Sequence, residues 1–115
     1  MRESGILMPV SSLPGPYGIG CFGKAAFQFV DFLSAAGQTI WQLLPLSPTG
    51  YGDSPYQSCS AFAGNPYFVD LEALEKEGLL TAADLKAESW GKDPLEVDYG
   101  TLYVSRFAVL RKAYA

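Results

Sequence analysis

Two short apolar runs flank one helical stretch within the first 45 residues, and this order constrains the fold more than any other feature. Residues 5–8 (GILM) form the first run, which ends at Pro9. Residues 24–36 lack glycine and proline, carry a wide apolar surface and are followed by Gly37, a typical helix stop. Residues 39–44 (TIWQLL) form the second run, which ends at Pro45. The pattern predicts a βαβ unit with buried parallel strands and a right-handed crossover, hence an α/β fold.

The remainder of the chain has a different composition. Residues 1–66 hold 9 of the 12 glycines and 7 of the 8 prolines, whereas residues 67–115 hold 15 of the 20 charged side chains. This second part predicts surface helices. Three helix starts are indicated, at Asp70, at Thr81 with Asp84 three residues on, and at Asp98. On the last helix, one stripe is predicted to pack in the core: Tyr103, Phe107, Leu110 and Tyr114.

Composition excludes several functional classes. The chain has no histidine, so it contains neither a Ser-His-Asp triad nor an imidazole metal site. Its two cysteines, Cys21 and Cys59, are too few for a four-thiolate zinc site and favour a reduced, cytoplasmic protein. The net charge of −4 argues against nucleic acid as a partner. No apolar run approaches the roughly 18 residues of a membrane span, so no membrane partner is expected.

A glycine motif before the first helix raises one alternative function. Residues 18–23 (GIGCFG) match G-x-G-x-x-G, which in dinucleotide-binding folds cradles a pyrophosphate. Three prolines, however, separate the motif from the preceding strand. No acidic residue for the ribose follows the second strand until Asp53. A dinucleotide site is therefore the less favoured interpretation.

The segment of residues 45–66 is the more informative candidate. It has neither a helical nor a strand period and only one charge, Asp53. Loops of this length in compact domains are usually functional, and this one follows a parallel strand, where α/β folds bind ligands. Tyr51 and Tyr56 offer flat rings and hydroxyls that suit a neutral, polyhydroxylated ligand. From chemistry alone, such a site and a structural lid whose tyrosines cover the core are equally favoured.

Several blocks of the chain resemble the 4-α-glucanotransferases of glycoside hydrolase family 77. They are residues 11–20 (SSLPGPYGIG), 41–46 (WQLLPL), 48–57 (PTGYGDSPYQ), 60–66 (SAFAGNP) and 97–99 (VDY). The resemblance implies the N-terminal part of a (β/α)₈ TIM barrel, which takes about 250 residues when complete. Residues 1–66 would form its first two βα units with a substrate-binding loop. Residues 67–115 would begin a helical subdomain inserted after the second strand, and the rest of the barrel would lie beyond this chain.

The resemblance also implies an activity. Family members transfer α-1,4-glucan segments between maltooligosaccharides or glucans derived from starch or glycogen by a retaining double displacement, without a metal or cofactor. The catalytic carboxylates have no matching position here, so no catalytic residue is assigned, and the isolated 115 residues are expected to be inactive and to fold poorly. Tyr56 matches a tyrosine that stacks on the donor sugar, and the same wall includes Asp53, Ser54, Pro55 and Gln57. Tyr51 matches a secondary glucan site. The competing interpretation is a non-catalytic α-glucan-binding module.

Overall fold

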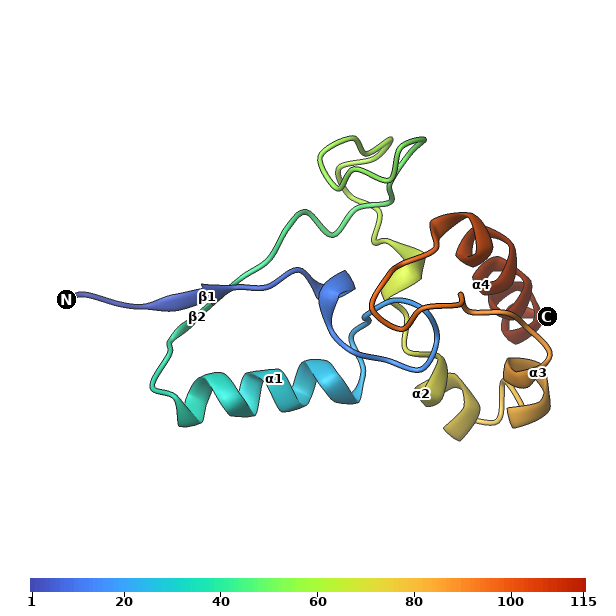
Figure 1. The fold of residues 1–115 in the computed structure, drawn as a ribbon, viewed down its shortest axis with the longest axis horizontal. Helices are drawn as coiled ribbons and strands as arrows, with labels where there is room; N and C mark the ends of the chain where they lie inside the picture. The colour runs from blue at the N-terminus through green and yellow to red at the C-terminus, as the bar shows by residue number, and fades with distance from the viewer.

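A parallel βαβ unit forms one end of the molecule. The computed structural model describes residues 1–115, and its two strands are β1 (Gly5–Leu7) and β2 (Ile40–Gln42). They pair in parallel, with Gly5 opposite Ile40 and Leu7 opposite Gln42. Helix α1 (Lys24–Ala35) connects them and lies beside the two-stranded sheet (Figure 1). The α/β class and the parallel pairing predicted from the sequence are confirmed.

The predicted burial of these strands is wrong. All three residues of β1 are exposed, including Leu7 at 52%. The sheet has only two strands, and its main cover is α1, where the Phe29 ring packs edge-on to Trp41 at a centroid distance of 5.0 Å. The outer side of α1 is apolar and exposed as well, with Phe27 and Phe32 open to solvent. Within this chain, the apolar runs therefore form strands without forming a core.

Three further helices pack together at the other end of the molecule (Figure 1). They are α2 (Leu71–Lys76), α3 (Ala82–Lys86) and α4 (Tyr99–Tyr114), preceded by two short 3₁₀ turns, η1 (Val10–Ser12) and η2 (Pro66–Phe68). The three predicted caps are confirmed. Asp70 accepts from the backbone N–H of Glu72, Asp98 accepts from that of Thr101, and Thr81 and Asp84 form a reciprocal capping box. None of the helices is long and apolar enough to cross a membrane.

The prediction for the stripe on α4 is half right: Phe107 and Leu110 are partly buried and pack against the core clusters. Tyr103 and Tyr114 are 67% and 96% exposed, so the prediction that they pack in the core is wrong. The buried stripe is displaced around the helix and consists of Leu102, Ser105, Arg106 and Val109. Val109 packs with leucines of α2, α3 and the turn between them, and Leu102 packs with Ile19 and Tyr67. Both stripes have helical spacing, and only the packing partners decide which one is buried.

Arg106 joins three segments at the centre of this core. Its guanidinium is 1% exposed and donates from Nη2 to the Val69 carbonyl at 2.6 Å and from Nη1 to the Tyr17 carbonyl at 3.4 Å. Burial lowers the pKa of this side chain, and the negative charge of the nearby Asp70 offsets part of that decrease. Arg106 thus fixes α4 against both the end of η2 and the glycine-rich loop.

Candidate functional site

The segment between β2 and η2 is an irregular loop with a closed base. The Asn65 backbone N–H donates to the Leu46 carbonyl at 2.8 Å, which draws the two ends together. Thr49 and Ser58 form an isolated antiparallel bridge, so the loop folds back on itself and projects from the molecule (Figure 1). Within the loop, Asp53 has a φ of 57°, a left-handed conformation that is uncommon for a residue with a side chain.

The tyrosines of this loop do not cover the core. Tyr51 is fully exposed and Tyr56 is 73% exposed. The interpretation of the loop as a structural lid is therefore wrong for these two rings in this chain. Large aromatic rings held open to solvent on a loop are typical of ligand-binding surfaces.

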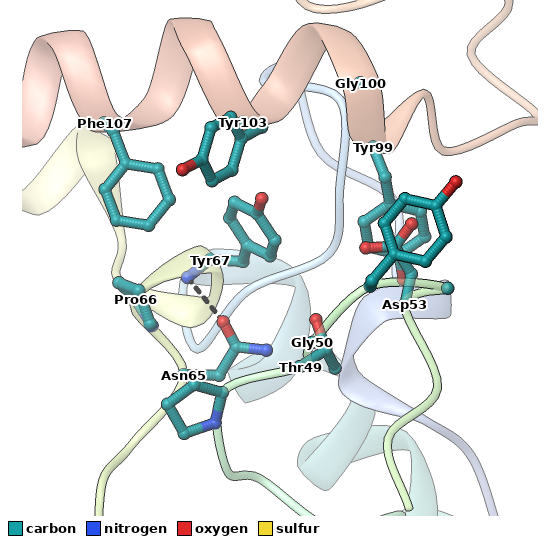
Figure 2. A pocket seen from close by; sticks show the side chains of 13 residues that line it. Thr49, Gly50, Asp53, Asn65, Pro66, Tyr67, Tyr99, Gly100, Tyr103 and Phe107 are labelled. Atoms are coloured by element: carbon teal, nitrogen blue, oxygen red, sulfur yellow. Dashed lines mark hydrogen bonds between the residues drawn. The ribbon is translucent and has the colours of Figure 1, made fainter. Parts of the chain in front are cut away.

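A cavity of about 770 Å³ lies between the base of this loop and α4 (Figure 2). We call it the tyrosine groove. One wall comes from the loop, the floor from η2 and the residues before it, and the other wall from α4. Its lining residues are Pro48, Thr49, Gly50, Tyr51, Gly52, Asp53, Asn65, Pro66, Tyr67, Tyr99, Gly100, Tyr103 and Phe107. The volume is within the range of small-molecule sites, and a single charged side chain, Asp53, lines it.

A smaller cavity of about 40 Å³ adjoins the groove where the segments that follow the two strands meet. Pro9 and Ser11 line it from the β1 side, and Leu44 and Pro45 line it from the β2 side. Asp53 lines both cavities. The loop base thus lies beyond the C-terminal ends of the parallel strands, where α/β folds place their ligand sites.

The structure brings together some of the predicted site residues. Tyr51 and Asp53 line the tyrosine groove, and Pro55 lines the smaller cavity. Tyr56, Ser54 and Gln57 line neither of these cavities. The Ser54 hydroxyl accepts from the Tyr56 backbone N–H at 3.3 Å, and the Ser54 carbonyl accepts from that of Gln57 at 3.1 Å. These contacts shape the turn that presents the Tyr56 ring.

Sequence reasoning missed the aromatic wall of the groove. Tyr103 and Phe107 point from α4 toward Tyr67 (Figure 2), with ring centroids 5.5 Å apart for Tyr103 and Phe107 and 5.9 Å apart for Tyr67 and Phe107. Tyr67 is held by Asn65, whose side-chain oxygen accepts from the Tyr67 backbone N–H at 2.9 Å. The signal was present, because Tyr103 and Phe107 stood out as a helical stripe that we assigned to the core.

Two phenols of the groove, those of Tyr67 and Tyr99, have a raised pKa, which favours their neutral form. Burial raises the pKa of Tyr67, and the Asp53 carboxylate raises it further. The same two causes, in the same order, raise the pKa of Tyr99. Neutral phenols both donate and accept hydrogen bonds, as the hydroxyls of an uncharged ligand require. No group of three or more His, Cys, Asp or Glu side chains is placed to hold a metal ion.

The glycine motif packs against the chain itself. A side chain at Gly20 would lie 2.0 Å from the Val10 carbonyl oxygen, and one at Gly18 would lie 2.3 Å from the Trp90 carbonyl oxygen. At Gly23, which precedes α1, it would meet the Asp70 carboxylate at about 3 Å. Each of these three glycines thus leaves room for a neighbouring segment, which gives the motif a packing role.

Comparison with known proteins identifies the family. The family model described as 4-alpha-glucanotransferase matches residues 8–115. The 4-alpha-glucanotransferase of Streptococcus pneumoniae is 57% identical over 112 residues, which are 97% of this chain and 22% of that protein. The 4-alpha-glucanotransferase of Thermus thermophilus is 50% identical over 113 residues, which are 98% of this chain and 22% of that protein.

A solved structure gives the same result. The amylomaltase from Streptococcus agalactiae in complex with acarbose matches 99% of this chain and 23% of its own, at 50% identity and a TM-score of 0.95. The chain therefore spans about a fifth of the length of these relatives. The resemblance seen in the sequence is confirmed, and the chain belongs to the 4-alpha-glucanotransferase family, glycoside hydrolase family 77.

Proposed function

We propose that this chain is part of a cytoplasmic 4-α-glucanotransferase that transfers α-1,4-glucan segments with retention of configuration. The observation that carries the proposal is the family match over residues 8–115, and the exposed tyrosine loop beyond the strand ends is consistent with it. In this proposal β1, α1 and β2 begin a (β/α)₈ barrel, and α2 to α4 begin a subdomain inserted beside it. The exposed apolar sides of the sheet and of α1 then pack against the remaining strands and helices of the barrel.

The proposed role of the loop is to form the wall of the donor site. The Tyr56 ring stacks on the apolar face of the sugar beside the cleaved bond and holds it as it flattens toward an oxocarbenium-like transition state. Asp53, Ser54, Pro55 and Gln57 shape the same wall, and the turn contacts of Ser54 orient the Tyr56 backbone. The attacking Asp and the Glu that serves as acid and base come from other parts of the protein. The reaction needs no metal or cofactor.

The tyrosine groove is proposed as a secondary glucan site. Tyr51 forms its outer edge, and the phenols of Tyr67, Tyr99 and Tyr103 line it. Acarbose is bound in the Streptococcus agalactiae relative, which supports α-glucans as the ligand class. Flat rings together with neutral hydroxyls match the alternating apolar faces and hydroxyl edges of pyranose rings.

The donor-site role is tested in the full-length parent protein with maltotriose. Replacing Tyr56→Ala should lower the rate of disproportionation by about tenfold, near the upper end of what one aromatic stacking contact contributes. Tyr56→Phe keeps the ring and should retain most of the activity. Tyr114→Ala is the matched control, because Tyr114 is also an exposed tyrosine yet lies at the far end of α4.

Two outcomes would count against the proposal. Wild-type rates in Tyr56→Ala would remove Tyr56 from the donor site. Binding of maltotriose by the full-length wild-type protein without any transfer would overturn the enzyme assignment in favour of a glucan-binding module.

A further inference from the structure

The tyrosine groove does not end at Phe107. A second cavity of about 340 Å³ follows it along α4 and is lined by Tyr103, Val104, Phe107, Ala108 and Arg111. Tyr103 and Phe107 line both cavities, so the two hollows share these two rings as a common wall. We call the second hollow the outer cavity. It extends the surface of the groove toward the C-terminal end of α4.

The two cavities form one track of substantial length. From Tyr99 to Arg111 the helix rises by about 18 Å at 1.5 Å per residue. Along this distance aromatic side chains recur four residues apart, at 99, 103 and 107, and therefore lie on one side of the helix. Figure 2 shows the groove half of the track, with Tyr99, Tyr103 and Phe107 following one another along α4.

The chemistry of the outer cavity favours the same kind of ligand as the groove. Four of its five lining residues carry no charge, and the fifth, Arg111, is an exposed guanidinium with no ion-pair partner. A guanidinium donates hydrogen bonds to hydroxyl oxygens, and the rings of Tyr103 and Phe107 offer flat apolar faces. A single positive charge among apolar groups is a weak attractant for a polyanion, whereas it suits a neutral carbohydrate.

We propose that the outer cavity holds further glucosyl units of a long α-1,4-glucan whose neighbouring units occupy the tyrosine groove. This inference rests on the proposed function and deepens it by specifying chain length as what the site recognises. A short oligosaccharide fills the groove alone and gains nothing from the outer cavity. A long chain occupies both in succession and binds more tightly, because its second contact is made without a separate association step.

The test blocks the outer cavity without disturbing the core. Ala108 is exposed and lies in the middle of α4, so Ala108→Glu adds a charged side chain to the cavity. Glutamate also favours the helical conformation, so α4 should remain intact. In the full-length protein this variant should bind amylose about tenfold more weakly, which corresponds to the loss of about 1.4 kcal/mol. Its loss of affinity for maltotriose should be smaller than its loss of affinity for amylose. The matched control is Ala83→Glu on α3, which makes the same change at an exposed alanine outside both cavities.

The outcomes separate this inference from the proposed function. Unchanged affinity of Ala108→Glu for amylose, with normal transfer by the wild type, would overturn the outer cavity alone. An equal loss of affinity for amylose and for maltotriose would also overturn it, because the cavity would then not recognise chain length. A melting temperature of Ala108→Glu below that of Ala83→Glu would overturn it as well, because another part of the protein would then cover the cavity. Absence of transfer by the wild-type protein would instead contradict the proposed function.

Discussion

Replacing Gly20→Ala tests whether the glycine motif serves packing or ligand binding. The added Cβ would lie 2.0 Å from the Val10 carbonyl oxygen and 2.7 Å from the backbone N and O of Leu13. Ordinary contact begins at 3.4 Å, and all three obstructing atoms belong to the backbone of a buried segment. Side-chain rotation therefore cannot relieve the clash, and η1 must move away from the motif.

The change in the free energy of unfolding is the sum of three contributions. Overpacking of a buried site costs about 1–3 kcal/mol. Displacing η1 also weakens the hydrogen bond from the Gly20 N–H to the Ser11 carbonyl, 3.1 Å long, which adds about 1 kcal/mol. The lower conformational entropy of alanine in the unfolded chain stabilises the folded state by about 0.5 kcal/mol. We expect a net loss of about 1.5–3.5 kcal/mol in the free energy of unfolding.

Urea denaturation of the full-length protein measures this loss. For a slope near 3 kcal/mol/M, the midpoint should fall by up to about 1 M. Gly64→Ala is the control, because Gly64 has nothing within 4 Å of the added Cβ and should leave the midpoint within about 0.2 M. Equal midpoints for the two variants would refute the packing argument. A dinucleotide site predicts the opposite pattern for Gly20→Ala, with stability retained and measurable NAD binding lost.

The remaining predictions concern titration and thiol chemistry. The hydrogen bond from Lys112, and then those from Thr81, lower the pKa of Asp84 to about 2 from 3.8. The lowered pKa means that ionised Asp84 stabilises the folded state above pH 3.8 and that this stabilisation is lost as the pH falls through 2. Lys112→Met should therefore flatten the dependence of the melting temperature on pH between 4 and 2. A slope equal to that of the control Lys86→Met would contradict the pairing of Lys112 with Asp84. Both cysteines are free, and burial raises the pKa of the half-buried Cys21. A thiol reagent should therefore label the native protein first at the exposed Cys59, which mass spectrometry can follow. Faster labelling of Cys21 would contradict this prediction.

Local signals in the sequence predict local structure well in this chain. The caps at Asp70, Thr81 and Asp98 each depend on a side chain that bonds a backbone N–H two or three residues away, so neighbouring residues suffice to specify them. Gly37 and Gly78 follow helices with φ values of 72° and 79°, a conformation that glycine adopts without strain. The parallel pairing of β1 and β2 follows from the crossover helix between them.

The sequence does not predict which apolar faces find partners. The strands were expected to be buried, yet burial depends on neighbours far along the chain, and a two-stranded sheet offers few. The same limitation explains α4, where Leu102 and Tyr103 are adjacent in sequence but one is in the core and the other lines the groove. The groove itself joins residues from 48 to 107, so no local pattern contains it.

The two kinds of tyrosine in the site differ in the conformational entropy that they would lose on binding the proposed glucan. Tyr67 and Tyr103 each pack edge-on against Phe107, and Tyr67 is fixed further by the Asn65 side chain, so their rings are ordered before a ligand arrives. Tyr51 and Tyr56 stand free on the loop and lose rotamer freedom when a sugar covers them. In the proposed function, Tyr67 and Tyr103 would therefore contribute affinity at little entropic cost, whereas Tyr51 and Tyr56 would contribute only the part of the stacking energy that remains after their rings are ordered. In the proposed function, the anchoring of a long glucan would therefore fall to the groove and the outer cavity, and Tyr56 would suit contacts that form and release with each transfer.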